Sequence, residues 1–214
     1  EIRLSLVGSE MCIRDSISGA PEKIKKQIRG KIGFMFQQGA LFDSLSVGEN
    51  VAFPLREEGI RNEKELDARI SAALDSVDLL GQQEKMPASL SGGMIKRVAV
   101  ARAIVTTPEC LLYDEPTAGL DPIVTDSISF LIRQICKDKG ITTVIVSHDM
   151  PSVIRIADKI VYLRNGEVYW TGTPEELLHS RDENLQRFLY GDSGEDWASP
   201  VSYTHLTLPT IYSV

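Results

Sequence analysis

The sequence has few of the residues from which disulfide frameworks and metal sites are built. Its 214 residues include three cysteines and three histidines. Cys12, Cys110 and Cys136 are odd in number and lack metal-ligand spacing, which suits a reducing cytosol and argues against a disulfide framework. The histidines are too few, and too far from the cysteines, to predict a zinc site.

Long hydrophobic runs are also absent. No uninterrupted apolar run approaches the roughly 20 residues needed to span a bilayer, so we expect any role at a membrane to go through a partner. The net charge of -7, from 23 basic and 30 acidic residues, argues against nucleic-acid binding as the main task. With 43% hydrophobic residues and no internal repeat, the chain suits one α/β domain with a helical insert.

A third absence concerns phosphate binding. A loop that cradles phosphate needs the pattern G-x-x-x-x-G-K-[ST]. The only Gly-Lys pair is Gly30-Lys31, which is followed by Ile32, and Lys25 stands where the first glycine is required. The pattern is therefore missing from this sequence.

The stretch from Leu90 to Asp121 carries most of the chemistry that is present. Ser91-Gly92-Gly93 opens a helical pattern, in which apolar residues recur at spacings of four, three and four from Met94 to Val105. Serine is a good N-cap, and glycines let another molecule approach the backbone. Such a helix start presents free N–H groups to an anion, typically a phosphate.

Two carboxylates follow the next predicted element. The apolar run Cys110–Tyr113 is typical of a buried parallel strand, and it delivers Asp114 and Glu115 at its carboxyl end, where ligands bind in open α/β sheets. Adjacent strand residues point to opposite faces, so one carboxylate can hold Mg²⁺ while the other polarises a water. Taken alone, the pair could equally be a solvated turn.

These segments resemble three motifs of ATP-binding cassette (ABC) ATPases. LSGGM is similar to the signature motif, CLLYDE to the Walker B strand and AGLD to the D-loop. The resemblance covers roughly residues 17 to 191. It implies an ABC-type α/β nucleotide-binding domain, with a parallel sheet, helices and a helical signature subdomain at about 43–107. Because the phosphate-loop pattern is missing, we expect a truncated N-terminal part.

The two ends of the chain do not resemble the family. Residues 1–16 and 200–214 are similar to translated adapter sequences, and we expect them to be non-native. The second of these segments lies within a C-terminal tail that starts at residue 192. Genuine but divergent termini are the alternative.

The resemblance implies ATP and Mg²⁺ as ligands and a role for each motif residue. Glu115 would polarise the attacking water, and His148, after the predicted buried strand 142–147, would contact the γ-phosphate. Asp114 and Gln37 would serve Mg²⁺. The signature residues Ser91, Gly92 and Gly93 would contact the nucleotide that the opposite subunit mainly holds. Asp121 would couple the two sites of a homodimer.

The remaining pattern predicts the elements around these motifs. Ser46 and Glu49 form a capping-box pattern, which opens a helix that we expect Pro54 to end. A second helix is predicted from Asn62 to Leu80. The basic residues of the signature helix are interpreted as surface residues that serve solubility and surface pairing: Lys96, Arg97 and Arg102. Asn165-Gly166 predicts a hairpin, a helix is expected to start at Thr173, and residues 184–190 are expected to finish the domain.

We therefore predict the ATP-hydrolysing subunit of an ABC transporter, peripheral on the cytoplasmic face of the bacterial inner membrane. A membrane permease would dock near Gly39–Leu45, an apolar loop. The segment FQQGALFDSLSVGENVAFPLRE is similar to the ATPases of Mla-type lipid transporters, which work with Mce-domain proteins. The alternatives are an ABC ATPase for another cargo and a soluble clamp protein of translation or DNA repair.

Overall fold

The computed structural model describes residues 19–190, and the ends predicted to be non-native lie outside this range. The chain divides into two compact units, the first ending at Pro174 and the second starting at Glu175. The first unit contains every residue that the sequence assigns to the site.

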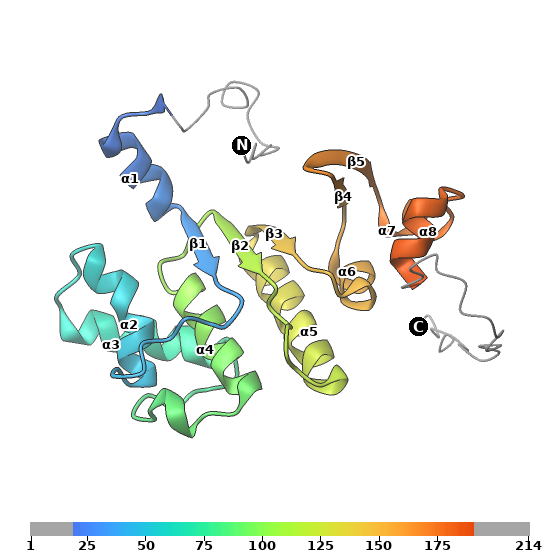
Figure 1. Cartoon of the computed structure of the whole chain (residues 1–214). Helices are drawn as coiled ribbons and strands as arrows, with labels where there is room; N and C mark the ends of the chain where they lie inside the picture. The colour runs from blue at the N-terminus through green and yellow to red at the C-terminus, as the bar shows by residue number, and fades with distance from the viewer. Residues whose placement is uncertain (1–18, 191–214) are drawn as a thin grey trace. The chain divides into compact units, whose positions relative to one another are not determined.

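A three-stranded parallel sheet forms the centre of the first unit (Figure 1). Its strands are β1 (Ile32–Met35), β2 (Cys110–Asp114) and β3 (Thr142–Val146), in the order β1-β2-β3. Met35 is paired with Tyr113, and Tyr113 with Ile145. The carboxyl ends of all three strands therefore meet at one edge, which confirms the arrangement predicted from the sequence.

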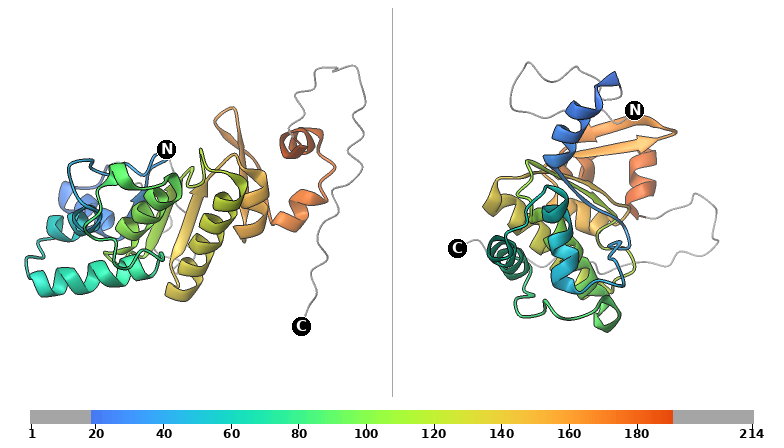
Figure 2. Two further views of the ribbon diagram at one scale, coloured as in Figure 1. Left: turned by 90° about the horizontal axis from the view of Figure 1, so that it is seen from below. Right: turned by 90° about the vertical axis from the view of Figure 1, so that its left-hand side faces the viewer.

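Helices α4 (Gly92–Ile104) and α5 (Pro122–Lys139) pack against one face of this sheet (Figures 1 and 2). The approach is close at Gly33, where an added Cβ would lie 2.2 Å from the carbonyl oxygen of Ala103. On this face Met35, Leu111 and Tyr113 are fully or almost fully buried. The glycine in β1 therefore allows α4 to contact the strand directly.

The opposite face of the sheet exposes apolar side chains. Phe34 and Val144 are exposed on either side of Leu112, which is half-buried. Val146 is 60% exposed. The prediction that the strand before His148 is buried was therefore wrong: its β-branched residues form the strand, but no side chain of β3 is fully buried among the described residues.

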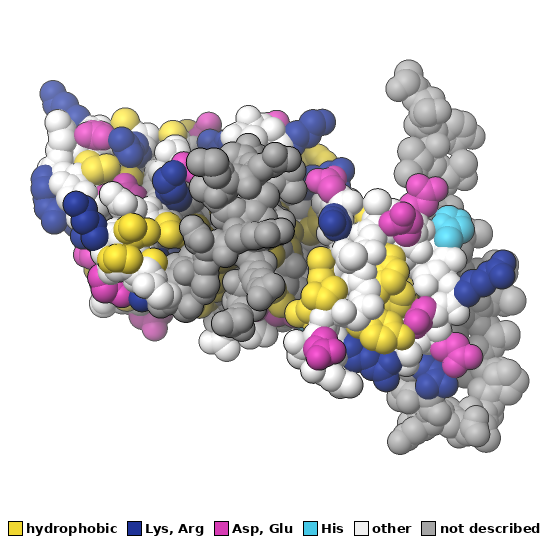
Figure 3. Space-filling view, turned by 90° about the horizontal axis from the view of Figure 1, so that it is seen from above, with side chains coloured by type: hydrophobic (Ala, Val, Ile, Leu, Met, Phe, Trp, Pro, Cys, Tyr) yellow, Lys and Arg dark blue, Asp and Glu magenta, His cyan; other side chains and the backbone are white. Residues whose placement is uncertain are grey.

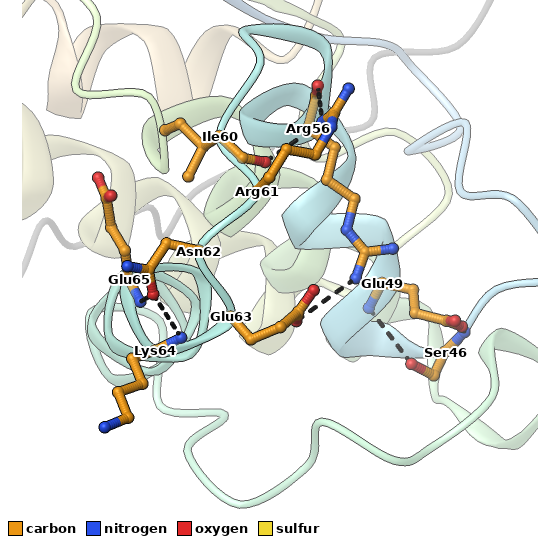
Figure 4. A network of polar contacts seen from close by, with 9 residues as sticks. All are labelled: Ser46, Glu49, Arg56, Ile60, Arg61, Asn62, Glu63, Lys64 and Glu65. Atoms are coloured by element: carbon orange, nitrogen blue, oxygen red, sulfur yellow. Dashed lines mark hydrogen bonds and ion pairs between the residues drawn. The ribbon is translucent and has the colours of Figure 1, made fainter.

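The segment between β1 and β2 is mainly helical, with α2 (Val47–Glu57), α3 (Glu63–Asp75) and the 3₁₀ turn η2 (Pro87–Ser89) before α4. The predicted capping box is present, because Ser46 and Glu49 exchange two hydrogen bonds at the start of α2 (Figure 4). Asn62 caps α3, and Arg56 of α2 pairs with Glu63 of α3.

Two predicted helix ends were wrong. Pro54 lies inside α2, which continues to Glu57 because Leu55, fully buried beyond the proline, outweighs one missing backbone hydrogen bond. Helix α3 ends at Asp75 and not at Leu80. Val77 is buried as its apolar pattern predicts, but it lies in a turn in which Asp78 has a φ of 59°.

The first unit also contains two further helices and a β-hairpin. Helix α1 (Glu22–Gly30) precedes β1, and α6 (Met150–Ile156) packs against α5. Strands β4 (Ile160–Arg164) and β5 (Glu167–Gly172) form an antiparallel hairpin whose turn residues Asn165 and Gly166 both have positive φ. The predicted hairpin is confirmed.

The second unit begins within α7 (Pro174–Leu178) and contains α8 (Glu183–Tyr190). Helix α7 agrees with the predicted helix start at Thr173, whereas α8 was not predicted as a helix. Leu177 and Leu185 are buried. Figure 3 shows a face of the molecule that carries hydrophobic patches together with charged side chains of both signs. Among residues 19–190, no helix is long and apolar enough to cross a bilayer.

Candidate functional site

Glu115 and His148 meet at the carboxyl edge of the sheet. Glu115 Oε1 lies 2.8 Å from His148 Nδ1 and accepts a hydrogen bond from the His148 backbone N–H at 3.1 Å. The hydrogen bond with Glu115, and then its negative charge, raise the pKa of His148, whose side chain is largely exposed. The structure thus brings together the two residues that the sequence assigned to catalysis.

Glu115 has an unusual backbone and one free oxygen. Its φ is 47°, in the left-handed region that side-chain-bearing residues rarely adopt, and its N–H donates to the carbonyl of Val146 at 2.9 Å. Glu115 Oε2 is buried with no hydrogen-bond partner among the described residues. Strained residues cluster at functional sites, and a buried unpaired carboxylate oxygen fits a group that awaits a ligand.

Asp114 and Gln37 supply the oxygen atoms suited to Mg²⁺. Asp114 ends β2, and Gln37 follows β1, so both lie at the carboxyl edge of adjacent strands. Mg²⁺ is usually held by one or two protein oxygens together with phosphates and waters. A carboxylate and an amide oxygen fit that demand, although the described residues contain no cluster of three His, Cys, Asp or Glu side chains suited to a metal.

Ser91 and its two glycines begin α4 as predicted. The Ser91 hydroxyl accepts a hydrogen bond from the Met94 N–H at 3.3 Å, which confirms it as the N-cap. Gly93 has a packing role as well, since an added Cβ would lie 2.8 Å from Val124 of α5. Asp121 caps α5 by accepting from the N–H groups of Ile123 and Val124. Among the described residues, no hydrogen bond or ion pair joins Ser91 or Asp121 to Glu115 or His148.

Lys96 is the residue that the sequence analysis misjudged most. Its side chain is buried, and Nζ donates to the carbonyl oxygen of Gln37 and, at 3.4 Å, to that of Glu115. Burial lowers the pKa of Lys96, while the charge of Glu115 acts in the opposite direction. The interpretation of Lys96 as a surface residue was wrong, because its long stem lies inward beneath the strand ends.

The two arginines of α4 also make specific contacts. Arg102 donates to the carbonyl oxygens of Gly39, at 2.5 Å, and of Ala40, at 2.7 Å. Arg97 donates to the carbonyl of Val77 and pairs with Asp78 at 2.6 Å. Each arginine therefore anchors a turn that is distant in sequence. The ion pair of Arg97 with Asp78 agrees with the predicted surface pairing, whereas Arg102 binds backbone carbonyls and forms no ion pair among the described residues.

A cavity of about 380 Å³ lies where three of these segments meet. The loop after β1, the first turns of α4 and the segment before Asp121 line it. The lining residues are Gln37, Gln38, Gly92, Ile95, Lys96, Ala118, Gly119 and Leu120. The cavity therefore lies between the Gln37 loop and the start of the signature helix, and neither Glu115 nor His148 lines it.

The apolar loop at 39–45 is fixed from one side and open on the other. Phe42 is 43% exposed, and its ring packs on Phe53 of α2 with centroids 4.8 Å apart. Asn50, which is fully buried, accepts from the Phe42 N–H and donates to the carbonyls of Phe42, Leu45 and Ser46. Asn50 was not predicted from the sequence, although a polar residue on the buried face of a helix is a detectable sign.

Taken together, the parallel sheet, the carboxylates at its edge and the glycine-containing helix start define an α/β domain with a ligand site at the strand ends. The sequence pattern of the family described as ABC transporter matches residues 4–118. The chain belongs to the ABC transporter family.

Similar proteins agree with this assignment. The intermembrane phospholipid transport system ATP-binding protein MlaF of Haemophilus influenzae is 40% identical over 167 residues, which cover 78% of this chain and 63% of that protein. The methionine import ATP-binding protein MetN of Caulobacter vibrioides is 38% identical over 176 residues, covering 82% and 53%.

The fold is shared with a solved dimer, the ATP-binding cassette MJ0796 in a post-hydrolysis state bound to ADP and Pi. The two are 34% identical, with a TM-score of 0.64 over 73% of this chain and 68% of that one. This chain spans about three-fifths of the length of the curated relatives MlaF.

Proposed function

We propose that this chain provides the catalytic edge of a transporter ATPase. The Glu115–His148 pair, at 2.8 Å, carries the proposal, because it places a carboxylate and an imidazole at the edge where a nucleotide would lie. Glu115 takes the proton of the attacking water, and His148 donates to the γ-phosphate. Asp114 and Gln37 would hold Mg²⁺, which when bound neutralises phosphate charge.

A substitution of Glu115 tests the proposal. In an extended chain that carries a phosphate loop ahead of residue 17, Glu115→Gln should lower kcat by about 10²–10⁴-fold, the usual contribution of a general base. ATP should still bind, because the substitution leaves the other phosphate contacts in place. Glu109→Gln, on an exposed residue paired with Lys31, is the matched control. Near-normal turnover of the Glu115 variant would remove Glu115 from the mechanism.

The polypeptide in its present form should not hydrolyse ATP. Its sequence lacks the pattern that supplies a backbone cradle and a lysine to the β- and γ-phosphates. Glu115 and His148 cannot position a nucleotide without these groups. Magnesium-dependent ATPase activity of the purified chain, clearly above that of its Glu115→Gln variant, would contradict this proposal.

We further propose that the 39–45 loop docks an integral membrane permease and holds the ATPase, as a homodimer, at the cytoplasmic face of the inner membrane. Phe42 and Phe53 form an exposed aromatic pair beside the site, and Asn50 fixes the loop in shape. Leu41→Glu combined with Phe42→Glu should abolish co-purification with the permease, while nucleotide binding by the extended chain persists. An intact complex would place the coupling surface elsewhere.

Phospholipid is the cargo that we propose, in a system with an Mce-domain protein. The support is the similarity to MlaF together with the FQQGALFDSLSVGENVAFPLRE segment. The similarity to MetN favours methionine import as a second candidate. Co-expression of the extended chain with the permease of each system decides between them: a stable complex with the phospholipid permease alone is expected, and a complex with the methionine permease alone would overturn the choice.

A further inference from the structure

The turn that follows Gln37 is held in a strained shape by cations of α4. Gly39 and Ala40 have φ values of 77° and 46°, and alanine rarely adopts the left-handed region. The Gly39 N–H closes the turn on the carbonyl of Phe36 at 2.8 Å. Arg102 binds two carbonyls of the turn and Lys96 a third. Hydrogen bonds from charged donors are stronger than neutral ones, so they can maintain this conformation.

Lys96 differs from Arg102 because it contacts both strand ends. Its Nζ donates to the carbonyl of Gln37, which follows β1, and to that of Glu115, which follows β2. The register pairs Met35 with Tyr113, so Gln37 and Glu115 each lie two residues beyond a paired position. Beyond that point the parallel ladder no longer fixes their separation. A buried ammonium group from a third element links the two backbones there.

We propose that Lys96 is a positioning residue that fixes Gln37 relative to Glu115, a role whose catalytic consequence rests on the proposed function. The Gln37 side chain, which would hold Mg²⁺, and the Glu115 side chain, which would take the proton, then keep a fixed relative position. Lys96 lies one turn after Gly92, so this contact also joins both strand ends to the start of the signature helix.

Amide hydrogen exchange in the chain itself tests the link without nucleotide. The Gly39 N–H, bonded to Phe36, reports on the turn, and the Glu115 N–H, bonded to Val146, reports on the end of β2. Lys96→Met keeps the stem and removes the ammonium group. It should speed exchange of both amides about tenfold, relative to the Ile132 amide in the core of α5. Lys96→Arg, which restores donors, should return both rates toward those of the unsubstituted chain.

Two comparisons separate this role from general stability. Arg102→Met should speed exchange at Gly39 but not at Glu115, because Arg102 contacts only the turn. Lys64→Met, at an exposed position of α3, should change neither. If Lys96→Met prevents folding, Lys96→Gln should give a smaller change of the same direction at both amides. The proposal would be overturned if the exchange rates of Gly39 and Glu115, relative to that of Ile132, were unchanged in a folded Lys96 variant. It would also be overturned if exchange in Lys96→Arg were as fast as in Lys96→Met.

A kinetic measurement connects the link to catalysis. In the extended chain with a phosphate loop, Lys96→Met should lower kcat by about 10–100-fold, the effect of misplaced catalytic groups, with KM for ATP changed by less than about twofold. Lys96→Arg should recover most of kcat. An equal loss in kcat and rise in KM would contradict a positioning role. If the unsubstituted extended chain hydrolyses no ATP, the proposed function fails, while the exchange rates still decide the role of Lys96.

Discussion

Glu115 and His148 illustrate how a single pair can depend on backbone position. The left-handed φ of Glu115 turns its side chain so that one oxygen meets both the ring and the N–H of His148, while the other oxygen stays buried and unpaired. A proton on the imidazole is stabilised by this carboxylate. The pair is therefore sensitive to pH in a range set by the histidine.

We expect Glu115→Gln to lower the pKa of His148 toward its ordinary value, because the hydrogen bond to a charged acceptor and the charge of Glu115 are lost. In the unsubstituted chain the raised pKa means that the pair stabilises the fold fully below about pH 6.5 and loses this contribution as pH rises through the folded-state value. The measurement is an NMR titration of the His148 ring. Glu109→Gln should leave the titration unchanged, and an unchanged curve in Glu115→Gln would show that the pair is absent in solution.

At this scale, the sequence could predict some residues and not others. Asp114, Glu115 and His148 follow β-branched or apolar runs, and residues after parallel strands reach one edge whatever the details of packing. Lys96 could not be assigned in the same way. A lysine on a helix has the same pattern whether its stem lies inward or outward, and its contact with Gln37 joins residues 59 positions apart.

Among the elements, the loop between β1 and α2 shows most clearly how helices shape a site. Three of its carbonyls bind cations of α4, and the polar groups of residues 42–46 bind Asn50 of α2. The loop has no helix or strand of its own, so these side chains add to the two turn hydrogen bonds of its backbone, Gly39 N–H to Phe36 and Leu45 N–H to Phe42. Its shape is thus determined by residues outside it.

Asn50→Ala should destabilise the fold by about 2–3 kcal/mol, because it leaves several backbone groups near the core without partners. Urea unfolding followed by circular dichroism measures the change. Asn62→Ala removes only a helix cap and should cost about 1 kcal/mol, which makes it a matched comparison. Equal losses for the two variants would mean that water replaces the contacts of Asn50 without penalty.

The two incorrect helix ends have a common cause. Both predictions relied on local sequence signals, the proline at Pro54 and the apolar stripe through Val77, and did not take tertiary contacts into account. Leu55 continues α2 past a proline because it is fully buried, whereas α3 stops at Asp75 because Arg97 binds the Val77 carbonyl and Asp78 in a turn. Propensity predicts that these helices exist, but tertiary contacts decide where they end.

At the scale of the whole molecule, the chain holds one half of the site that the family resemblance implies. It carries the signature helix start at Ser91 but no phosphate-loop pattern. Each nucleotide would lie between the phosphate loop of one subunit and the signature of the other. The solved dimer similar to this chain was captured with ADP and Pi.

A mixed dimer should therefore trap one nucleotide and not two. The chain is mixed with a full-length relative whose own signature serine is changed to arginine, so that only Ser91 of this chain can close a site. Nucleotide trapped per dimer is the measurement. Ser91→Arg in this chain should abolish trapping, and no trapping by the unsubstituted, folded mixture would show that its half-site is not competent.

The parallel pairing of β1 with β2 also sets the order in which the chain can fold. Its partners, such as Ile32 and Cys110, are 78 positions apart, and the helices α2 to α4 lie between them. Contacts of such high sequence separation require a long loop to close first, which slows folding. We therefore expect the helices to make their shorter-range contacts before β1 pairs with β2. The sheet edge that carries Glu115 and His148 would then be completed late, after the helices that contact it have folded.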